Sequence, residues 1–215
     1  MTKTRRLIEA NLKLIDVVVE ILDARVPLSG RNASFDDILK GKPRLLVLNK
    51  TDLADKSKTD EWIKWYKNNG ITVIPISCAD GAGVNKVISS AEELIKDKLE
   101  AERSKGRNRT LKIMMAGIPN VGKSSLINRL CGRASAKTGD KAGVTKGKQW
   151  IKIRGGAELF DTPGMLPPKF ENQEIAQKLA YIGSIKDEII NTELLAYSLC
   201  EYLRDEYPDL LFIGE

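Results

Sequence analysis

The sequence contains no histidine in its 215 residues. This absence excludes histidine metal ligands, hydrolysis by a Ser–His–Asp triad and a histidine general base. Cysteine is also scarce, because the three that are present, Cys78, Cys131 and Cys200, lie far apart and form no CxxC pair. We therefore expect no zinc ribbon and no disulfide framework, and a cytoplasmic, reducing environment is the expected location.

Long hydrophobic runs are absent as well. The longest, residues 15–22, is interrupted by Asp16 and Glu20 and falls far short of the ~20 apolar residues that span a membrane. Residues 1–6 lead into a polar, amphipathic stretch and show no signal-peptide pattern. The sequence therefore predicts no membrane partner, while its 42% of hydrophobic residues suffices for a sizeable core.

What the sequence does contain is an alternation of apolar, β-branched runs with helix-like stretches. This alternation is typical of an α/β fold with a mostly parallel sheet, here of six strands. A polar, basic stretch at about residues 100–110 predicts an exposed linker. We expect one domain at residues 1–166 and a short C-terminal helical segment at residues 167–215. Strands are predicted at residues 17–22, 45–48, 73–76, 111–116, 150–154 and 158–160, and helices at residues 2–14, 60–68, 84–101, 124–130, 171–182 and 193–205.

Residues 117–124 read GIPNVGKS and match the GxxxxGKS phosphate-binding pattern between a strand and a helix. The glycines let the backbone N–H groups converge on a phosphate, and the helix N-terminus adds its positive dipole end. Lys123 should then reach the β- and γ-phosphates, and the Ser124 hydroxyl should bind magnesium. The predicted nucleotide-binding residues of this loop are Asn120, Val121, Gly122, Lys123, Ser124 and Ser125.

Residues 49–52 read NKTD after a predicted strand and supply the base selectivity that a phosphate loop lacks. The Asp52 carboxylate can accept two hydrogen bonds from the ring N–H and the exocyclic amine of guanine, a donor pair that adenine lacks. One helix later, residues 77–79 resemble the short loop of GTPases whose backbone N–H contacts the guanine oxygen. The predicted base-binding residues are Asn49, Lys50 and Asp52, together with Ser77, Cys78 and Ala79.

Residues 161–164 read DTPG and follow a further strand. Asp161 can hold magnesium through water, and the N–H of Gly164 can contact the γ-phosphate. Thr145 lies between this segment and the phosphate loop, which makes it the candidate switch threonine that completes magnesium coordination. The predicted catalytic residues are Lys123, Thr145 and Gly164, and the predicted magnesium ligands are Ser124, Thr145 and Asp161.

These motifs occur in permuted order, because a conventional small GTPase begins with the phosphate loop and ends with the base motifs. A circular permutation gives the same sheet when the original termini lie close together. With Asp23-Ala24-Arg25 after the first strand, then NKTD, GIPNVGKSS and DTPG, the chain resembles the circularly permuted ribosome-assembly GTPases of the YlqF/RbgA group. The resemblance implies a GTP-hydrolysing assembly factor for the large (50S) ribosomal subunit, which binds rRNA in a nucleotide-dependent way and is a monomer.

The chain departs from the group pattern at both ends. Group members resemble one another in a WYPGHM-like stretch before the first helix, which contains a histidine proposed for hydrolysis, and Met1 falls where the methionine of that stretch would be. The segment at residues 167–215 is also shorter than the C-terminal helical domain of the group. We therefore expect either a shortened sequence or a protein that lacks this histidine.

The sequence alone does not single out the group that positions the catalytic water. Conventional GTPases place a glutamine after the DxxG glycine, whereas Met165 cannot orient a water, so we expect slow hydrolysis that the ribosomal particle stimulates. Asn120 resembles the asparagine that binds potassium in potassium-activated GTPases, although it can equally stabilise the loop. Asp23 and Arg25 form either a structural ion pair, which we favour, or a contact to RNA. The alternative functions are a non-hydrolysing, nucleotide-gated RNA-binding protein and a P-loop ATPase or small-molecule kinase, although NKTD argues against the last two.

The net charge of +6 and the pI near 9.1 suit a nucleic-acid partner. Two basic clusters predict salt-sensitive contacts to the rRNA backbone, with a solvated loop as the alternative for the first. Trp62 and Trp65 have helical spacing and are predicted to pack rather than to stack on bases. The first cluster comprises Arg133, Lys137, Lys141, Lys146, Lys148, Lys152 and Arg154, and the linker cluster comprises Arg103, Lys105, Arg107 and Arg109.

Overall fold

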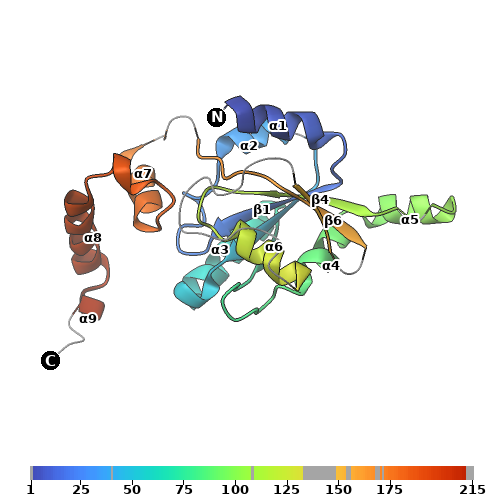
Figure 1. Cartoon of the computed structure of the whole chain (residues 1–215). Helices are drawn as coiled ribbons and strands as arrows, with labels where there is room; N and C mark the ends of the chain where they lie inside the picture. The colour runs from blue at the N-terminus through green and yellow to red at the C-terminus, as the bar shows by residue number, and fades with distance from the viewer. Residues whose placement is uncertain are drawn as a thin grey trace.

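The structure is a computed structural model that describes residues 2–39, 41–107, 109–132, 149–153, 156–167, 170 and 172–211. Its centre is a six-stranded sheet in the order β3-β2-β1-β4-β6-β5, and helices cover both faces (Figure 1). The strands are β1 (Val17–Asp23), β2 (Arg44–Asn49), β3 (Thr72–Pro75), β4 (Leu111–Ala116), β5 (Gln149–Lys152) and β6 (Ala157–Asp161). The helices are α1 (Thr2–Leu12), α2 (Ala33–Ile38), η1 (Thr51–Leu53), α3 (Lys56–Asn68), α4 (Lys86–Glu93), α5 (Lys96–Ser104), α6 (Lys123–Cys131), α7 (Gln173–Tyr181), η2 (Asp187–Ile189), α8 (Thr192–Glu206) and α9 (Pro208–Leu211).

The sheet is parallel except for the pairing of β5 with β6, which confirms the predicted, mostly parallel sheet of six strands. β1 is buried along its whole length, because a central parallel strand has helices on both faces. The chain runs outward from β1 through β2 to β3 and then returns to the centre at β4. The carboxyl ends of β1 and β4 therefore lie side by side where the two directions diverge, and open α/β sheets bind ligands at such a point.

Alternate residues of β1 face two different sides of the sheet. Val17, Val19 and Ile21 join the hydrophobic cluster to which α4 and α6 contribute, whereas Val18 and Leu22 face the side covered by α1, α2 and α3. In Figure 1, α1 and α2 lie above the sheet and α4 and α6 lie below it. Burial of each such aliphatic side chain stabilises the fold by about 1.5–3 kcal/mol, so the strand ends that carry the motifs are held firmly.

The connection from β3 to β4 differs from the prediction. The sequence predicts one helix at residues 84–101 and a linker from about residue 100, but the structure has two helices, and α5 continues to Ser104. The helix breaks at Ile95, whose φ is −127° and whose side chain is buried. Because α5 buries none of its residues, it lacks the apolar stripe that periodicity detects, and its Lys, Glu, Ala and Arg residues favour a helix by propensity alone. The short helices α2 and α9 were also not predicted, because four to six residues show too little of a helical period.

The C-terminal segment has one part that packs on the sheet domain and one part that extends from it. Leu179 of α7 and the nearby Ile185 are buried in the main hydrophobic cluster. By contrast, α8 buries none of its residues and projects away from the sheet with α9 (Figure 1). In the part of the chain that the structure describes, no helix is both long enough and apolar enough to cross a membrane.

The tryptophans of α3 lie in an aromatic group on the outside of the sheet domain. Trp62 is partly buried and packs against the cluster that contains Tyr66, as predicted. The ring centroids of Trp62 and Trp65 are 5.5 Å apart in an edge-on arrangement, and Trp65 remains 44% exposed. Packing is therefore confirmed for Trp62, while Trp65 contacts its aromatic neighbours and also remains partly exposed to solvent.

Candidate nucleotide-binding site

The phosphate loop connects the end of β4 to the start of α6 at the centre of the sheet edge. Three of its residues have positive φ, namely Gly117 at 151°, Asn120 at 62° and Gly122 at 97°. At Gly122 an added Cβ would lie only 2.3 Å from Nδ2 of Asn49. Glycine is therefore required there both by the curled backbone and by the contact with the base motif.

Lys123 begins α6, and only 8% of it is exposed. Its Nζ donates to the carbonyl oxygen of Gly117, at 3.2 Å, and to that of Ile118, at 2.9 Å, so the ammonium group lies inside the loop. Burial lowers the pKa of Lys123 to about 8, and the carboxylate of Asp161 opposes this shift only in part. A buried ammonium group with so little compensating charge suits a site that receives an anion.

Asn49, at the end of β2, joins the base motif to the phosphate loop. Its Nδ2 donates to the carbonyl oxygen of Val121 at 2.8 Å. Its Oδ1 accepts from the backbone N–H of Cys78 at 3.0 Å. The structure thus brings together three segments that the sequence predicts as parts of one site, although Val121 lies 72 residues from Asn49.

Arg129 is a residue of this site that the sequence analysis did not identify. It lies in the last turn of α6, where its Nε donates to the carbonyl oxygen of Cys78 at 2.9 Å and its Nη2 donates to that of Ala79. The guanidinium group therefore holds the predicted base loop from the side of the phosphate-loop helix. The sequence contains no signal for this role, because a basic residue near a helix C-terminus is common for its own reasons.

The turn that follows Asn49 presents Asp52 to solvent. Lys50 has a φ of 64°, so the backbone turns sharply after β2. Thr51 then fastens the turn to the end of β3, because its N–H and its Oγ1 both donate to the carbonyl oxygen of Ile76, at 3.3 and 2.9 Å. The Asp52 side chain on η1 is exposed and open to an incoming base.

The end of β1 supplies a buried carboxylate that organises two basic side chains. Asp23 accepts hydrogen bonds from Nε and Nη2 of Arg25, at 2.9 and 2.7 Å, and its Oδ2 lies 3.1 Å from Nζ of Lys50. The same Nζ donates to the carbonyl oxygen of Asn120 at 2.8 Å. The ion pair favoured for Asp23 and Arg25 is confirmed, and through Lys50 it supports the phosphate loop.

This carboxylate should contribute to stability in a pH-dependent way. Burial opposes the ionisation of Asp23, but the hydrogen bonds from Arg25 and the charges of Lys50 and Arg25 outweigh it and hold its pKa below the usual value. Because the folded state lowers the pKa, the contribution is complete above about pH 4 and is lost as the pH falls through the lowered pKa. Asp23→Asn should therefore lower the free energy of unfolding by about 2–3 kcal/mol at pH 7, and the deficit should shrink towards pH 3. Urea denaturation of both proteins across this range measures it, and a deficit that does not depend on pH would contradict the assignment.

The DTPG segment lies directly on the phosphate loop. Asp161 ends β6, next to β4, and is 1% exposed. Gly164 is so close to Pro119 that an added Cβ would lie 2.8 Å from its N and 2.9 Å from its Cα. The N–H of Met165 donates to the carbonyl oxygen of Gly117 at 3.2 Å. Met165 itself is 3% exposed and packs in the cluster with α1 and α2, so its side chain belongs to the hydrophobic core.

Gly164→Ala should separate GTP hydrolysis from nucleotide binding. The added methyl group would clash with the backbone of Pro119, so the segment could not stay docked on the phosphate loop. We expect GTP hydrolysis to fall at least about tenfold, whereas the affinity for GDP, which has no γ-phosphate, should change less than about threefold. Phosphate release and a fluorescent GDP analogue measure the two effects. Gly70→Ala is the control, because it adds the same methyl group where no other atom lies within 4 Å, although at a φ of 72°, and an equal loss of hydrolysis there would contradict the argument.

The phosphate loop also contacts the C-terminal segment. Nδ2 of Asn120 donates to the carbonyl oxygen of Gly183 at 2.5 Å, and Oγ of Ser184 donates to that of Pro119 at 2.9 Å. Ser184 is completely buried, so this contact is part of the packed structure. The side chain suggested as a potassium ligand therefore also links the loop to the turn after α7.

Some of the predicted residues lie outside the described part of the chain. They are Thr145 and, in the first basic cluster, every member except Lys152. Among the described residues, Ser124 and Asp161 offer a hydroxyl and a carboxylate oxygen, the hard donors that magnesium prefers. The described residues contain no group of three or more His, Cys, Asp or Glu that could hold a metal ion.

The chain is similar to GTPases that are named for ribosome assembly. A family model described as "50S ribosome-binding GTPase" matches residues 112–199. Ribosome biogenesis GTPase A of Priestia megaterium is 46% identical over 213 residues, which cover 98% of this chain and 74% of the relative. The protein of the same name from Bacillus licheniformis is 45% identical over 212 residues, which cover 98% and 75%. Among solved structures, GNP-bound YlqF from T. maritima has a TM-score of 0.67 and 28% identity over 94% of this chain and 75% of its own, and a GDP-bound YlqF structure has a TM-score of 0.62, 28% identity and coverage of 88% and 70%.

These likenesses extend over the motifs on both sides of the phosphate loop, which fits the permuted order. The geometry of the site agrees with nucleotide binding, because the phosphate loop that encloses Lys123 is hydrogen-bonded through Asn49 to a base motif that ends in an exposed carboxylate. The relatives are GTPases, which sets aside the non-hydrolysing and ATP-dependent alternatives. The chain belongs to the ribosome biogenesis GTPase A family, the YlqF/RbgA group, and is a GTPase with a circularly permuted fold that binds GTP and GDP and serves in ribosome assembly.

Proposed function

We propose that this GTPase acts on the large ribosomal subunit as a monomer, binds rRNA in its GTP state and leaves after hydrolysis. The observation that carries the proposal is that two segments contact the phosphate loop from different sides. Gly164 of the DTPG segment lies against Pro119, and the turn after α7 is hydrogen-bonded to Pro119 and Asn120. A change at the γ-phosphate would therefore act on both segments, and through α7 on the projecting helix α8. The description of the matching family model, which names the 50S subunit, supports this choice of partner.

The residues of this chain would neutralise the charge of the phosphates and hold the nucleotide in position. Lys123 would bind the β- and γ-phosphates in place of the loop carbonyls that hold it here. Gly164 would offer its backbone N–H to the γ-phosphate, and Lys50 would keep the loop in place through Asn120. Magnesium, when held by Ser124, Asp161 and Thr145, would neutralise the charge that develops during phosphoryl transfer.

At position 165 the chain has no side chain that can orient a water molecule. Met165 is buried among apolar residues of the cluster with α1 and α2. Hydrolysis in the isolated protein should therefore be slow, and the missing organisation would come from the ribosomal particle and from potassium near Asn120. Potassium and the contact of Asn120 with Gly183 would then influence each other, because both involve the same side-chain amide.

Phosphate release from GTP tests the proposed function. We expect large ribosomal subunits to accelerate it about tenfold or more, small subunits to leave it unchanged, and potassium chloride to support faster hydrolysis than sodium chloride. Equal rates with both subunits would refute a specific role on the large subunit. Equal rates in the two salts would remove potassium from the mechanism while leaving the ribosomal partner untouched.

A further inference from the structure

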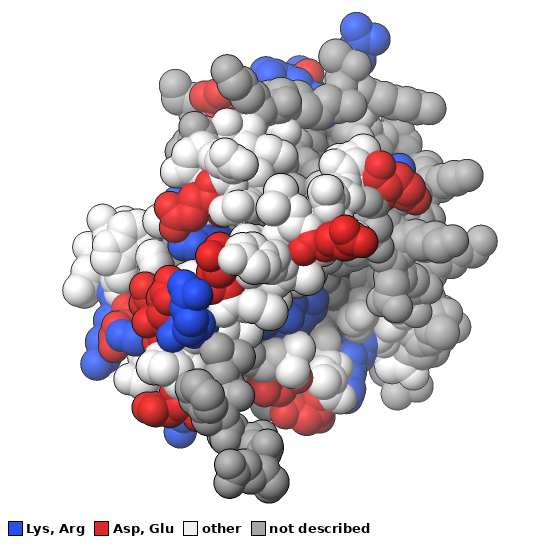
Figure 2. Space-filling view, turned by 90° about the vertical axis from the view of Figure 1, so that its left-hand side faces the viewer, with Lys and Arg blue, Asp and Glu red and all other residues white. Residues whose placement is uncertain are grey.

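Charge is distributed unevenly between two ends of the molecule. Residues 96–112, which comprise α5 and the segment that leads through Leu111 into β4, contain seven Lys or Arg and three Asp or Glu. Residues 173–211, which comprise α7 to α9, contain three Lys or Arg and eight Asp or Glu. In Figure 1, α5 projects from one side of the sheet domain and α8 lies at the opposite side. Figure 2 shows acidic side chains on the α8 side, with some basic side chains between them. The field of the protein therefore attracts a polyanion to the α5 end and repels it from the α8 end.

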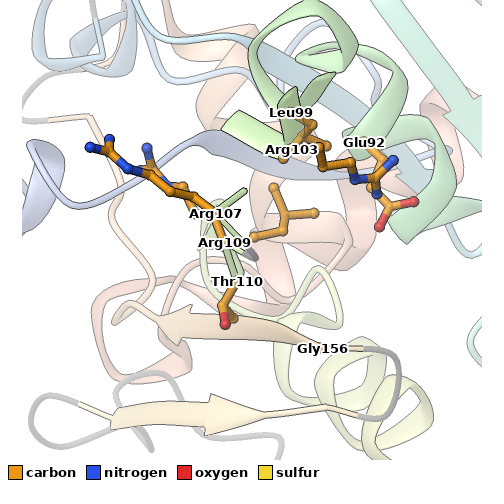
Figure 3. Close-up of a pocket in the computed structure, with 8 residues that line it drawn as sticks. Glu92, Leu99, Arg103, Arg107, Arg109, Thr110 and Gly156 are labelled. Carbon is orange, nitrogen blue, oxygen red and sulfur yellow. The ribbon is translucent and has the colours of Figure 1, made fainter. Parts of the chain in front are cut away.

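A hollow of about 320 Å³ lies at the basic end (Figure 3). Arg103 of α5 lines one side of it, and Arg107, Arg109 and Thr110 of the segment before β4 line the other. Glu92 is the one carboxylate among its lining residues. We call this the linker hollow, and the residues that line it include three arginines and a threonine against a single acid.

Arg109 is committed to the fold and holds the linker hollow in shape. Its Nη2 donates to Oδ1 of Asp16 at 2.7 Å, and Nζ of Lys98 donates to the same oxygen at 2.9 Å. Oδ2 of Asp16 accepts from the backbone N–H of Lys112 at 3.1 Å. Because Asp16 is only 3% exposed, these contacts fix α5 and the start of β4 to one buried point. The backbone that carries the linker cluster is thus fixed in place, which lowers the entropy cost of binding a ligand.

Arg103 and Arg107 are available in a way that Arg109 is not. Both are exposed. Nη1 of Arg107 lies 3.5 Å from a carboxylate oxygen of Glu102, a partly exposed pair of the kind that contributes about 0–1 kcal/mol. Arg103 forms no ion pair with any residue that the structure describes. Separate phosphate groups could therefore bind the two guanidinium groups without breaking a strong contact.

We propose that the linker hollow binds phosphates of the rRNA backbone through Arg103 and Arg107, with Thr110 as an additional hydroxyl donor. This rests on the proposed function, which supplies the RNA. Arginine forks match phosphate oxygens, and a polyanion gains further from the release of its counterions, which favours RNA over an acidic protein. The hollow lies at the amino end of β4, whereas the phosphate loop follows its carboxyl end, one strand length or about 20 Å away. RNA and GTP can therefore be bound at the same time.

The test compares Arg103→Gln/Arg107→Gln with a matched control, Lys64→Gln/Lys67→Gln, which removes the same charge from the exposed surface of α3. Filter binding would use rRNA extracted from large subunits as the probe, with GTP-bound protein between 50 and 200 mM KCl. We expect the arginine variant to bind about tenfold more weakly at 50 mM, with a log–log salt slope shallower by about two, because two phosphate contacts are lost. The control should remain within about twofold of the wild type, and GTP affinity should be unchanged in both variants.

Equal losses in the two variants would show a non-specific charge effect and overturn the linker hollow as a site, as would rRNA binding that neither variant weakens. Weaker binding of the arginine variant to whole large subunits, with unchanged binding to the extracted rRNA, would mean that the hollow contacts a protein and would overturn the assignment to RNA. Wild-type protein that binds no rRNA in any nucleotide state would refute the rRNA-binding part of the proposed function together with the hollow. Undiminished binding by the arginine variant alone would refute only the location.

Discussion

Lys123→Ala should lower kcat/KM for GTP hydrolysis by about 10²–10³-fold. Lys123 is the first residue of α6, and its ammonium group lies inside the phosphate loop. It is held there by hydrogen bonds to the carbonyl oxygens of Gly117 and Ile118. When nucleotide binds, its negatively charged phosphates would replace these neutral carbonyl acceptors. The ammonium group is therefore stabilised most in the nucleotide-bound state. Single-turnover phosphate release and titration with a fluorescent GTP analogue measure the losses in hydrolysis and in binding.

Two further variants separate this effect from misfolding. Lys123→Met keeps the apolar stem and removes only the charge, while Lys86→Ala removes an exposed lysine from the first turn of another helix. Since burial lowers the pKa of Lys123 to about 8, its charge destabilises the nucleotide-free fold at neutral pH. The Met variant should therefore unfold at an equal or higher temperature than the wild type without nucleotide, and GTP should raise its Tm less. A Met variant that hydrolyses GTP normally would disprove the role of the charge.

Asp52→Asn should reverse the base preference. The carboxylate can accept from both donors of guanine, whereas an amide presents a donor of its own to one of them, so GTP affinity should fall at least about 100-fold. The same amide can donate to the 2-oxo group of xanthine, and xanthosine triphosphate should become the tighter ligand. Because Asp52 is exposed on η1, the substitution should leave stability nearly unchanged.

Competition between the two nucleotides measures this reversal directly. Asp55→Asn is the matched control, since Asp55 lies three residues later and caps α3 by accepting from the N–H of Lys58, a role that asparagine also fills. The control should retain the guanine preference of the wild type. If Asp52→Asn also keeps that preference, the guanine edge must be read elsewhere, and the backbone of Ser77, Cys78 and Ala79 would be examined next.

The sequence by itself determined the strands and the chemistry at their ends. Each strand was predicted within a few residues, because buried parallel strands are short, β-branched runs whose signal is local. GIPNVGKS, NKTD and DTPG were recognisable because phosphate and base chemistry impose residue types at fixed spacing. Since each motif follows a strand, the parallel sheet places all of them on one edge.

The tertiary structure decided which residues contact one another at that edge of the sheet. Arg129 holds the base loop, Asn49 joins that loop to Val121, and Arg109 is committed to Asp16 while Arg103 is not. The break before α5 and its extension to Ser104 likewise escaped prediction, because this helix depends on propensity rather than on an apolar stripe. These contacts link residues that lie far apart in the chain, and they follow from the order of the strands and the packing of helices. Local periodicity and motif spacing carry no information about such partners, whereas the folded sheet fixes them because each side chain occupies the space that its neighbours leave.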